Sequence, residues 1–288
     1  MPVSDIPSKR RAWSGALRVY SHNIWAREGD WHARRRVLTD GGIRALDPDI
    51  VALQKTVVTA GYDQVDDLLD GDWHVAHSRE RAADGMGISI VSRWPITAVY
   101  EPDLNLSPRT ADFACTALIV EVSAPAPLGP LVVVNHFPDV QVDHEREREL
   151  QTVRVVRFVA DLLAHRPAHV LLAGDLDAEP DAASLRFLTG RQSLDGLSVC
   201  YRNTWDAVHP AAPGGTFVAS NPVAPDHWPF ERIDHILIRC GEHGGPTLRI
   251  EGCELAFAEP VDGVWASNHL GLVADFASDS SSGPLDSP

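Results

Sequence analysis

Short apolar runs rich in β-branched residues recur through the chain, and polar side chains stand at their ends. Runs such as 17–25 (LRVYSHNIW), 131–137 (LVVVNHF) and 169–176 (HVLLAGDL) predict buried β-strands, because β-branched residues favour extended backbone. Further runs of this kind occupy residues 49–54, 87–92, 114–122, 232–239, 248–257 and 270–276. The polar residues that end or flank these runs are Asn23, Gln54, Lys55, His136, Asp175, Asp177, Asp234, His235, Asn268 and His269. Polar clusters at strand ends are typical of the sites of α/β proteins.

Two segments between the strand-like runs carry apolar residues at helical spacing. Residues 31–46 form one, interrupted by a pair of glycines, and residues 143–165 form the longest amphipathic stretch. Strands mixed irregularly with helices predict a single α/β domain over residues 15–276. We expect residues 1–14 to be a flexible N-terminus, and residues 277–288, which are low in apolar side chains, to be a disordered tail.

Charge and composition narrow the class of protein. The net charge of −15 argues against non-specific binding to DNA, RNA or anionic membranes and leaves a local basic groove as the alternative. We expect no nucleic-acid partner and no membrane insertion. No stretch approaches the roughly 18 apolar residues that cross a bilayer, and the N-terminus shows no apolar signal-peptide centre. The cysteines show no metal-ligand spacing, and we expect reduced core thiols of a cytoplasmic protein, with a disulfide as the alternative: Cys115, Cys200, Cys240 and Cys253. The pattern predicts no oligomeric state.

The order and wording of the polar clusters resemble the endonuclease/exonuclease/phosphatase superfamily, the metal-dependent phosphoesterases related to deoxyribonuclease I and to sphingomyelinases. The segment GMGISIVSRWPI at 85–96 resembles the family's strand-and-turn signature, and 204–217 (TWDAVHP to GGTF) resembles its loop before the RID strand. The resemblance runs from about residue 17 to 276. It implies an α/β fold like that of deoxyribonuclease I, a four-layer sandwich of two packed mixed β-sheets flanked by helices.

The resemblance also implies roles for individual residues. His269 matches the family's general base, and Asp234 matches the carboxylate that fixes the tautomer of that base. Asp175 matches the aspartate that orients the nucleophile. Asn23 and His136 match positions that contact substrate and phosphate, although His136 fits a structural histidine equally well.

Three positions depart from the family pattern. Lys55 stands where the family has its metal-binding glutamate, Asn268 where it has an aspartate that helps hold the metal, and Asp177 where it has an asparagine. Without a metal, Lys55, Asn268, Asp175 and Asp177 have the same formal charge as the family's carboxylates together with a divalent cation. We therefore expect the Lys55 ammonium to replace the cation and to pair with one or both aspartates, with no cofactor.

Aromatic side chains stand close in sequence to these positions. We expect Trp25, Phe137, Trp228 and Trp265 to line an apolar pocket for a small-molecule substrate. The candidate substrate-binding residues are these four together with Asn23 and Asn268. The candidate catalytic residues are Lys55, His136, Asp175, Asp177, Asp234 and His269.

Three hypotheses about function follow. The first is a divergent enzyme that acts on a small organic molecule by metal-independent acid–base chemistry, through hydrolysis, elimination or cyclisation. The second is a phosphoesterase that uses Mg²⁺ or Mn²⁺, held by Asp175, Asp177 and Asn23, on a small phosphate ester or a lipid headgroup. The third is a non-catalytic binding protein on the same fold.

Overall fold

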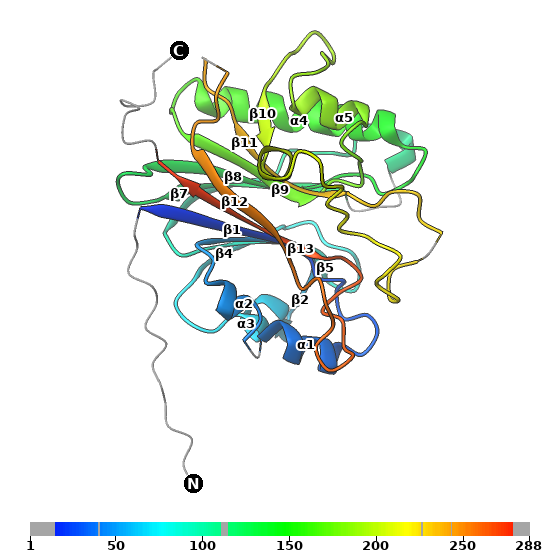
Figure 1. Ribbon diagram of the computed structural model, residues 1–288. Helices are drawn as coiled ribbons and strands as arrows, with labels where there is room; N and C mark the ends of the chain where they lie inside the picture. The colour runs from blue at the N-terminus through cyan, green and yellow to red at the C-terminus, as the bar shows by residue number, and fades with distance from the viewer. Residues whose placement is uncertain (1–14, 40, 111–114, 226, 243, 279–288) are drawn as a thin grey trace.

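The computed structural model describes residues 15–39, 41–110, 115–225, 227–242 and 244–278, and its strands form two sheets (Figure 1). The first sheet has the order β12-β13-β1-β2-β5-β4, and β3 pairs with β2. Its strands are β1 (Ala16–Asn23), β2 (Ile50–Thr59), β3 (Tyr62–Asp63), β4 (His74–His77), β5 (Met86–Ser92), β12 (Arg249–Ala256) and β13 (Gly271–Ala277). The second sheet has the order β10-β11-β9-β8-β7-β6. Its strands are β6 (Ile96–Tyr100), β7 (Thr116–Ser123), β8 (Pro130–Phe137), β9 (His169–Asp175), β10 (Tyr201–Asn203) and β11 (Asp234–Arg239).

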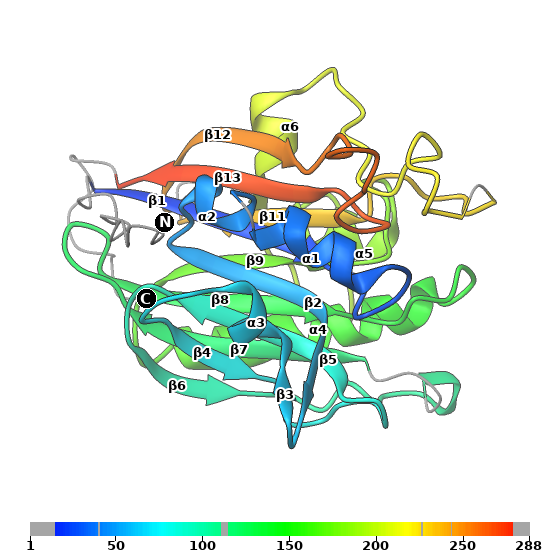
Figure 2. The same cartoon turned by 90° about the horizontal axis from the view of Figure 1, so that it is seen from below.

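Helices cover the outer faces of both sheets, which makes four layers (Figures 1 and 2). The first sheet is covered by α1 (Trp31–Thr39), α2 (Ile43–Leu46) and α3 (Gln64–Leu68). The second sheet is covered by α4 (Glu145–Leu163) and α5 (Ala183–Leu188). The remaining helices are α6 (Thr204–Val208) and the 3₁₀ turn Pro108–Thr110. The predicted α/β four-layer sandwich of two mixed sheets is confirmed.

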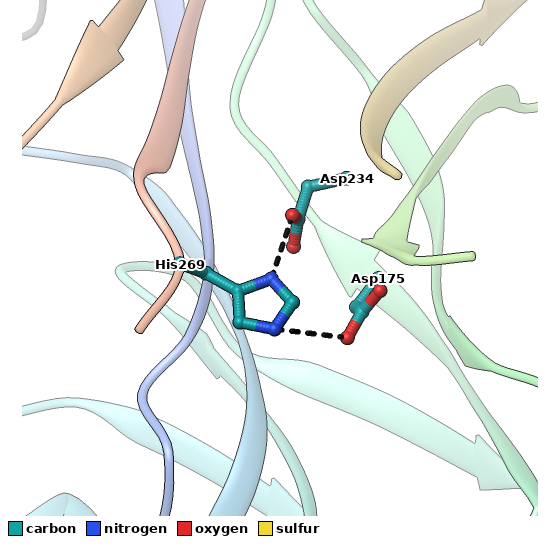
Figure 3. Close-up of side chains that lie close together, drawn as sticks. All are labelled: Asp175, Asp234 and His269. Carbon is teal, nitrogen blue, oxygen red and sulfur yellow. Dashed lines mark hydrogen bonds and ion pairs between the residues drawn. The ribbon is translucent and has the colours of Figure 1, made fainter. Parts of the chain in front are cut away.

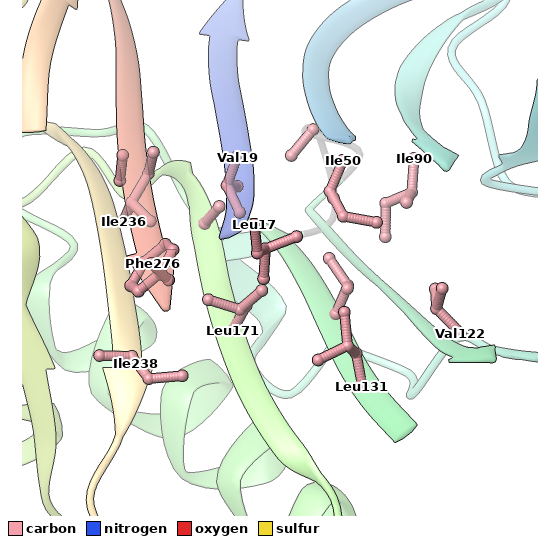
Figure 4. Packing of buried hydrophobic residues seen from close by; sticks show 14 of the residues in the cluster. Leu17, Val19, Ile50, Ile90, Val122, Leu131, Leu171, Ile236, Ile238 and Phe276 are labelled. Atoms are coloured by element: carbon pink, nitrogen blue, oxygen red, sulfur yellow. The ribbon is translucent and has the colours of Figure 1, made fainter. Parts of the chain in front are cut away.

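The main core lies between the two sheets (Figure 4). Side chains alternate along each strand, so Leu17 and Val19 of β1 face the second sheet while Tyr20 packs under the helices. In the same way Leu131 and Val133 of β8 face the first sheet. This alternation decides which strand-end side chains point into the space between the sheets, where the polar cluster lies.

The sequence patterns locate the long elements well and the short ones poorly. The predicted helix 143–165 is α4, whereas the predicted helix 31–46 is divided into α1 and α2 at the glycine pair. A Cβ on Gly42 would lie 2.3 Å from the Val37 carbonyl oxygen, so the chain turns there on a residue without a side chain. The expected flexible segment 1–14 lies outside the described residues. So does most of the expected disordered tail 277–288, although Ala277 ends β13.

The predictions about the cysteines and about membrane-spanning segments can be compared with the fold. Cys240 and Cys253 are buried and Cys115 is half-buried, but Cys200 is exposed, so the prediction of a core thiol is wrong there. Cys200 directly precedes β10, an edge strand of only 3 residues. Within the described ranges, no helix combines the length and the hydropathy needed to cross a membrane.

Candidate active site

The polar residues come together because strand pairing aligns the ends of four strands. β1 runs parallel to β2 with Asn23 beside Gln54, and β9 runs antiparallel to β11 with Asp175 beside Asp234. His269 lies in the segment that leads into β13, which pairs with β1. Residues far apart in sequence therefore converge at one edge of the sandwich.

An aspartate–histidine pair forms the centre of the cluster (Figure 3). His269 Nδ1 lies 2.9 Å from Asp234 Oδ2, and both side chains are buried. The Thr216 hydroxyl donates to the same Asp234 oxygen at 2.6 Å, and the Asp234 amide donates back to that hydroxyl at 3.2 Å. These contacts fix the direction in which His269 presents its other ring nitrogen.

The other ring nitrogen, His269 Nε2, faces a second carboxylate. Asp175 Oδ2 lies 3.8 Å from it (Figure 3). The Asn23 side-chain amide lies 3.1 Å from it. The Asn23 amide also donates to Asp175 Oδ2 at 2.8 Å. The Ser267 hydroxyl donates to the Asn23 carbonyl at 2.6 Å, which ties the segment before β13 to β1. Nε2 is thus the part of the pair that can exchange a proton with a substrate.

Burial controls the protonation of the pair. Burial lowers the pKa of His269 to about 4, with Asp175 acting in the opposite direction. Burial also raises the pKa of Asp234 to about 7, opposed by the Thr216 hydrogen bond and by the charge of Lys55. His269 is therefore an uncharged imidazole at neutral pH, the form that accepts a proton.

Lys55 supplies positive charge to the cluster without a direct ion pair. Among the described residues, its ammonium has no carboxylate within 4.0 Å, so the expected contact with the aspartates is not formed. Nζ lies instead 5.9 Å from the centre of the Phe137 ring. Burial raises the pKa values of Asp175, Asp177 and Asp234, and the charge of Lys55 opposes this rise. The same charge opposes protonation of His269.

Among the aspartates of the cluster, Asp177 has the most strained backbone. Its φ is +46°, and its Oδ2 is buried with no hydrogen-bond partner among the described residues. Burial and the charge of Asp175 raise its pKa well above the ordinary value, while Lys55 and Arg148 act against them. The folded protein therefore binds a proton at Asp177 more tightly than the unfolded chain does.

We expect Asp177→Asn to remove a pH-dependent loss of stability. Because the folded pKa is raised, the contribution of Asp177 is fully present below its unfolded pKa, near 3.8, and is lost as the pH rises through the folded value. The variant should gain about 1–3 kcal/mol in free energy of unfolding at pH 8, the usual cost of a buried polar group without a partner, and much less at pH 4. Urea unfolding at both pH values measures this, with the exposed Asp161→Asn as control. Equal shifts at the two pH values would contradict the assignment.

Two predicted histidines do not point into the cluster. His136 lies between Asn135 and Phe137 on β8, and alternation places it on the outer face with Val132 and Val134, which pack under α4. His235 also faces outward, and its Nε2 lies 2.9 Å from the Ala178 carbonyl. Phe137, which faces the space between the sheets, is the β8 residue beside Lys55.

The four predicted aromatic residues do not line one pocket. Trp25 is half-buried against the Arg34 guanidinium, 4.8 Å from its ring, and its amide donates to Asn23 Oδ1 at 3.0 Å. Phe137 belongs to the core between the sheets. Trp228 packs on Phe217 in a small separate cluster, and Trp265 is half-buried.

Sequence reasoning missed Thr216, Phe217 and Ser267 as contributors to the site. The Phe217 ring lies 4.5 Å from the His269 ring, centre to centre, and covers one face of it. Thr216 and Phe217 belong to the GGTF stretch, so the motif contained a signal that was not assigned to residues. Asn268 accepts from the Ser267 hydroxyl at 3.3 Å and lies beside His269, as its place in the motif predicts.

The donors at the site do not fit a resident divalent cation, which the family resemblance implies. Asp175, Asp234 and His269 place ligand atoms within 4.8 Å of one another. However, His269 Nδ1 and Asp234 Oδ2 are bound to each other, and Asp175 Oδ2 accepts from Asn23. Mg²⁺ requires near-octahedral oxygen coordination, and the ammonium of Lys55 repels a second cation in the same field.

Comparison with known proteins identifies the relatives of this chain. The profile of the Endonuclease/Exonuclease/phosphatase family matches residues 21–271. A truncated Caenorhabditis elegans TDP2 is similar in structure, with a TM-score of 0.70 and 19% identity over 91% of this chain and 98% of that one. The human Nocturnin catalytic domain with bound sulfate anion gives a TM-score of 0.67 and 18% identity over 91% and 93% of the two chains. No curated protein sequence matches the chain.

One relative corrects the prediction about partners. D. rerio TDP2 complexed with single strand DNA product has a TM-score of 0.70 to this chain, with 19% identity over 91% of this chain and 99% of that one. The prediction that excluded nucleic acid is therefore wrong, because a protein of this fold holds DNA. A net charge of −15 describes the whole chain and does not exclude a local groove that binds a polyanion.

Proposed function

Because this chain belongs to the endonuclease/exonuclease/phosphatase family, we propose that it is an enzyme of that fold which works by metal-independent acid–base chemistry on a small organic molecule. The Asp234–His269 pair is the base, and Lys55 is the fixed positive charge of the site. The observation that carries this proposal is the orientation of His269. Its Nδ1 is held by Asp234 at 2.9 Å, while Nε2 is left facing Asn23 and Asp175.

The pair can move a proton in both directions. A substrate hydroxyl, amine or water placed against Nε2 gives its proton to the neutral imidazole, and Asp234 stabilises the imidazolium that forms. Asp175, 3.8 Å from Nε2, stabilises the same charge and orients the group that loses the proton. The imidazolium then returns the proton to the leaving group or product, which restores the uncharged imidazole of His269.

Lys55 stabilises negative charge that develops on the substrate. Its ammonium acts on the carboxylates of the cluster through space, and it makes no ion pair with a described residue. An anion formed on the substrate next to this ammonium is stabilised more strongly than in water, because the surrounding side chains are buried. Lys55 is also half-buried, unlike its fully enclosed neighbours, so we expect the substrate to approach over it.

Screening of the chelator-treated protein tests this function. We expect turnover of a small ester, lactone or related protic substrate that persists in excess EDTA and falls by about 10³-fold or more in His269→Asn, as for other acid–base residues acting as a unit. The glutamine variant of the outward-facing His136 serves as the matched control, since it changes a buried histidine of the same region. Activity that appears only with added Mn²⁺ would overturn the metal-independent proposal and return the protein to the phosphoesterases.

A further inference from the structure

The backbone that presents Lys55 is strained. Lys55 has φ of +55° and lies where the pairing of β2 with β5 shifts between Leu53 and Thr56. A residue other than glycine in this region costs on the order of 1–3 kcal/mol and persists only when its surroundings hold it there. Contacts made by the residues that follow Lys55 on β2 therefore help to hold this conformation.

Side chains from neighbouring elements hold the two residues after Lys55. The Arg81 guanidinium donates to the Thr56 carbonyl at 2.8 Å. The Gln64 side chain accepts from the Val57 amide at 2.8 Å. These side-chain bonds add to the strand ladder, which resumes after the bulge with Thr56 paired to Gly87 and Val57 to Met86 of β5.

The Thr56 hydroxyl begins a chain of polar groups that is buried at Thr56 and Ser89 and half-buried at His77 and Asp63. It lies 2.8 Å from the Ser89 hydroxyl, which lies 2.8 Å from His77 Nδ1. His77 Nε2 lies 3.0 Å from Asp63 Oδ2. Asp63 Oδ1 in turn accepts from the Val65 amide at 2.8 Å, which anchors the chain at the start of α3.

The resemblance of Ser89, His77 and Asp63 to a hydrolytic triad is geometric only. The Ser89 side chain is completely buried, and its hydroxyl is enclosed by Thr56, His77 and the Arg81 guanidinium, 3.4 Å away. A nucleophile needs access to substrate, which this serine does not have. The chain orients hydroxyl groups instead, and its last member, Thr56, is the residue directly after Lys55.

We propose that Asp63, His77, Ser89, Thr56 and Arg81, here called the Thr56 network, are positioning residues that hold the left-handed bulge and so fix the place of the Lys55 ammonium in the site. The network restrains the residue directly after Lys55 through both its carbonyl and its hydroxyl. The proposal rests on the proposed function, in which the ammonium of Lys55 is the fixed cation of the site. It assigns a part in that site to residues on β3, β4, β5 and the segment between β4 and β5.

The reactivity of Lys55 tests the proposal without a substrate. The chain contains only two lysines, Lys9 and Lys55, so peptide mass mapping after brief acetylation with acetic anhydride reports Lys55 directly, with Lys9 as internal reference. Thr56→Val keeps the shape of the side chain and removes its hydroxyl, and Thr56→Ser keeps the hydroxyl. We expect acetylation of Lys55 relative to Lys9 to rise severalfold in Thr56→Val and to stay at the wild-type rate in Thr56→Ser.

A second variant guards against a change that only affects folding. Ser89→Ala breaks the chain one step further from Lys55, and it should raise the relative acetylation in the same direction at a temperature well below the melting point of each variant. Unchanged relative rates in both Thr56→Val and Ser89→Ala would overturn the positioning role. Because acetylation needs neither turnover nor a metal, the result is independent of whether the acid–base proposal holds.

Discussion

Replacing Lys55 by glutamate and Asn268 by aspartate together should strengthen Mn²⁺ binding by the protein. The double change removes one positive charge and adds two carboxylates beside Asp175, whose pKa burial already raises. Hard divalent cations need several carboxylate oxygens and no competing cation. We expect binding to tighten from weaker than millimolar to about micromolar, a change of about 10³-fold or about 4 kcal/mol. Calorimetric titration of chelator-treated protein with Mn²⁺ measures it.

The single variant Lys55→Met is the matched control for this experiment. It removes the positive charge without adding a ligand, so it separates relief of repulsion from new coordination. A further variant that adds Asp175→Asn to the double change should lose most of the gained affinity. Micromolar Mn²⁺ binding by the wild-type protein itself would show that Lys55 tolerates a metal, and it would contradict the fit of the donors described above.

The sequence predicted the fold because its strongest patterns are local. Runs such as 131–137 and 169–176 alternate or are wholly apolar over a full strand, and their order matches one known architecture. The short strands β3, β4, β6 and β10 escaped prediction, because two to five residues show too little periodicity. The division of 31–46 into two helices depended on how closely Gly42 approaches the Val37 carbonyl, which a pattern does not reveal.

The sequence predicted several residues of the candidate site, but it did not predict the contacts that they make. Asp234 and His269 were named from their motifs, and the structure places them 2.9 Å apart. His136 was matched to a phosphate-contacting position, but it lies on the outer face of β8, because the run VVVNHF leaves open which of two alternate residues points inward. Lys55 lies at the bulge in β2 and makes no direct ion pair with the aspartates, and a bulge cannot be recognised in a hydrophobic pattern.

Thr216 shows a second limit of sequence patterns. Its hydroxyl bonds to Asp234 across 18 residues of mostly irregular chain, 2.6 Å away in space. Such a contact depends on the path of a loop, and neither periodicity nor spacing encodes that path. Motif resemblance marked the stretch GGTF but could not divide roles among its residues. The supporting residues of a site are therefore harder to predict from sequence than its titratable groups.

Changing Asp234 to asparagine should nearly abolish turnover of the substrate found by screening. The aspartate accepts from Nδ1–H and leaves Nε2 as the base. An asparagine amide in that place can donate to Nδ1, which moves the proton to Nε2 and removes the base. We expect kcat to fall by about 10³–10⁴-fold with little change in the melting temperature, as the removal of a tautomer-fixing aspartate does in hydrolytic triads. Steady-state kinetics and thermal unfolding measure the two effects.

The pH profile separates loss of the base from loss of structure. Since burial raises the pKa of Asp234 to about 7 and lowers that of His269 to about 4, wild-type kcat/KM should fall as the pH drops below about 7, where Asp234 becomes protonated and no longer accepts from Nδ1–H. It should fall again below about pH 5 as His269 becomes protonated. Thr216→Val removes the hydrogen bond that opposes the rise in the pKa of Asp234, so it should move the first fall to higher pH and lose about tenfold in rate. An Asp234→Asn protein with near wild-type kcat would mean that His269 moves no proton, and the cluster would then serve binding alone.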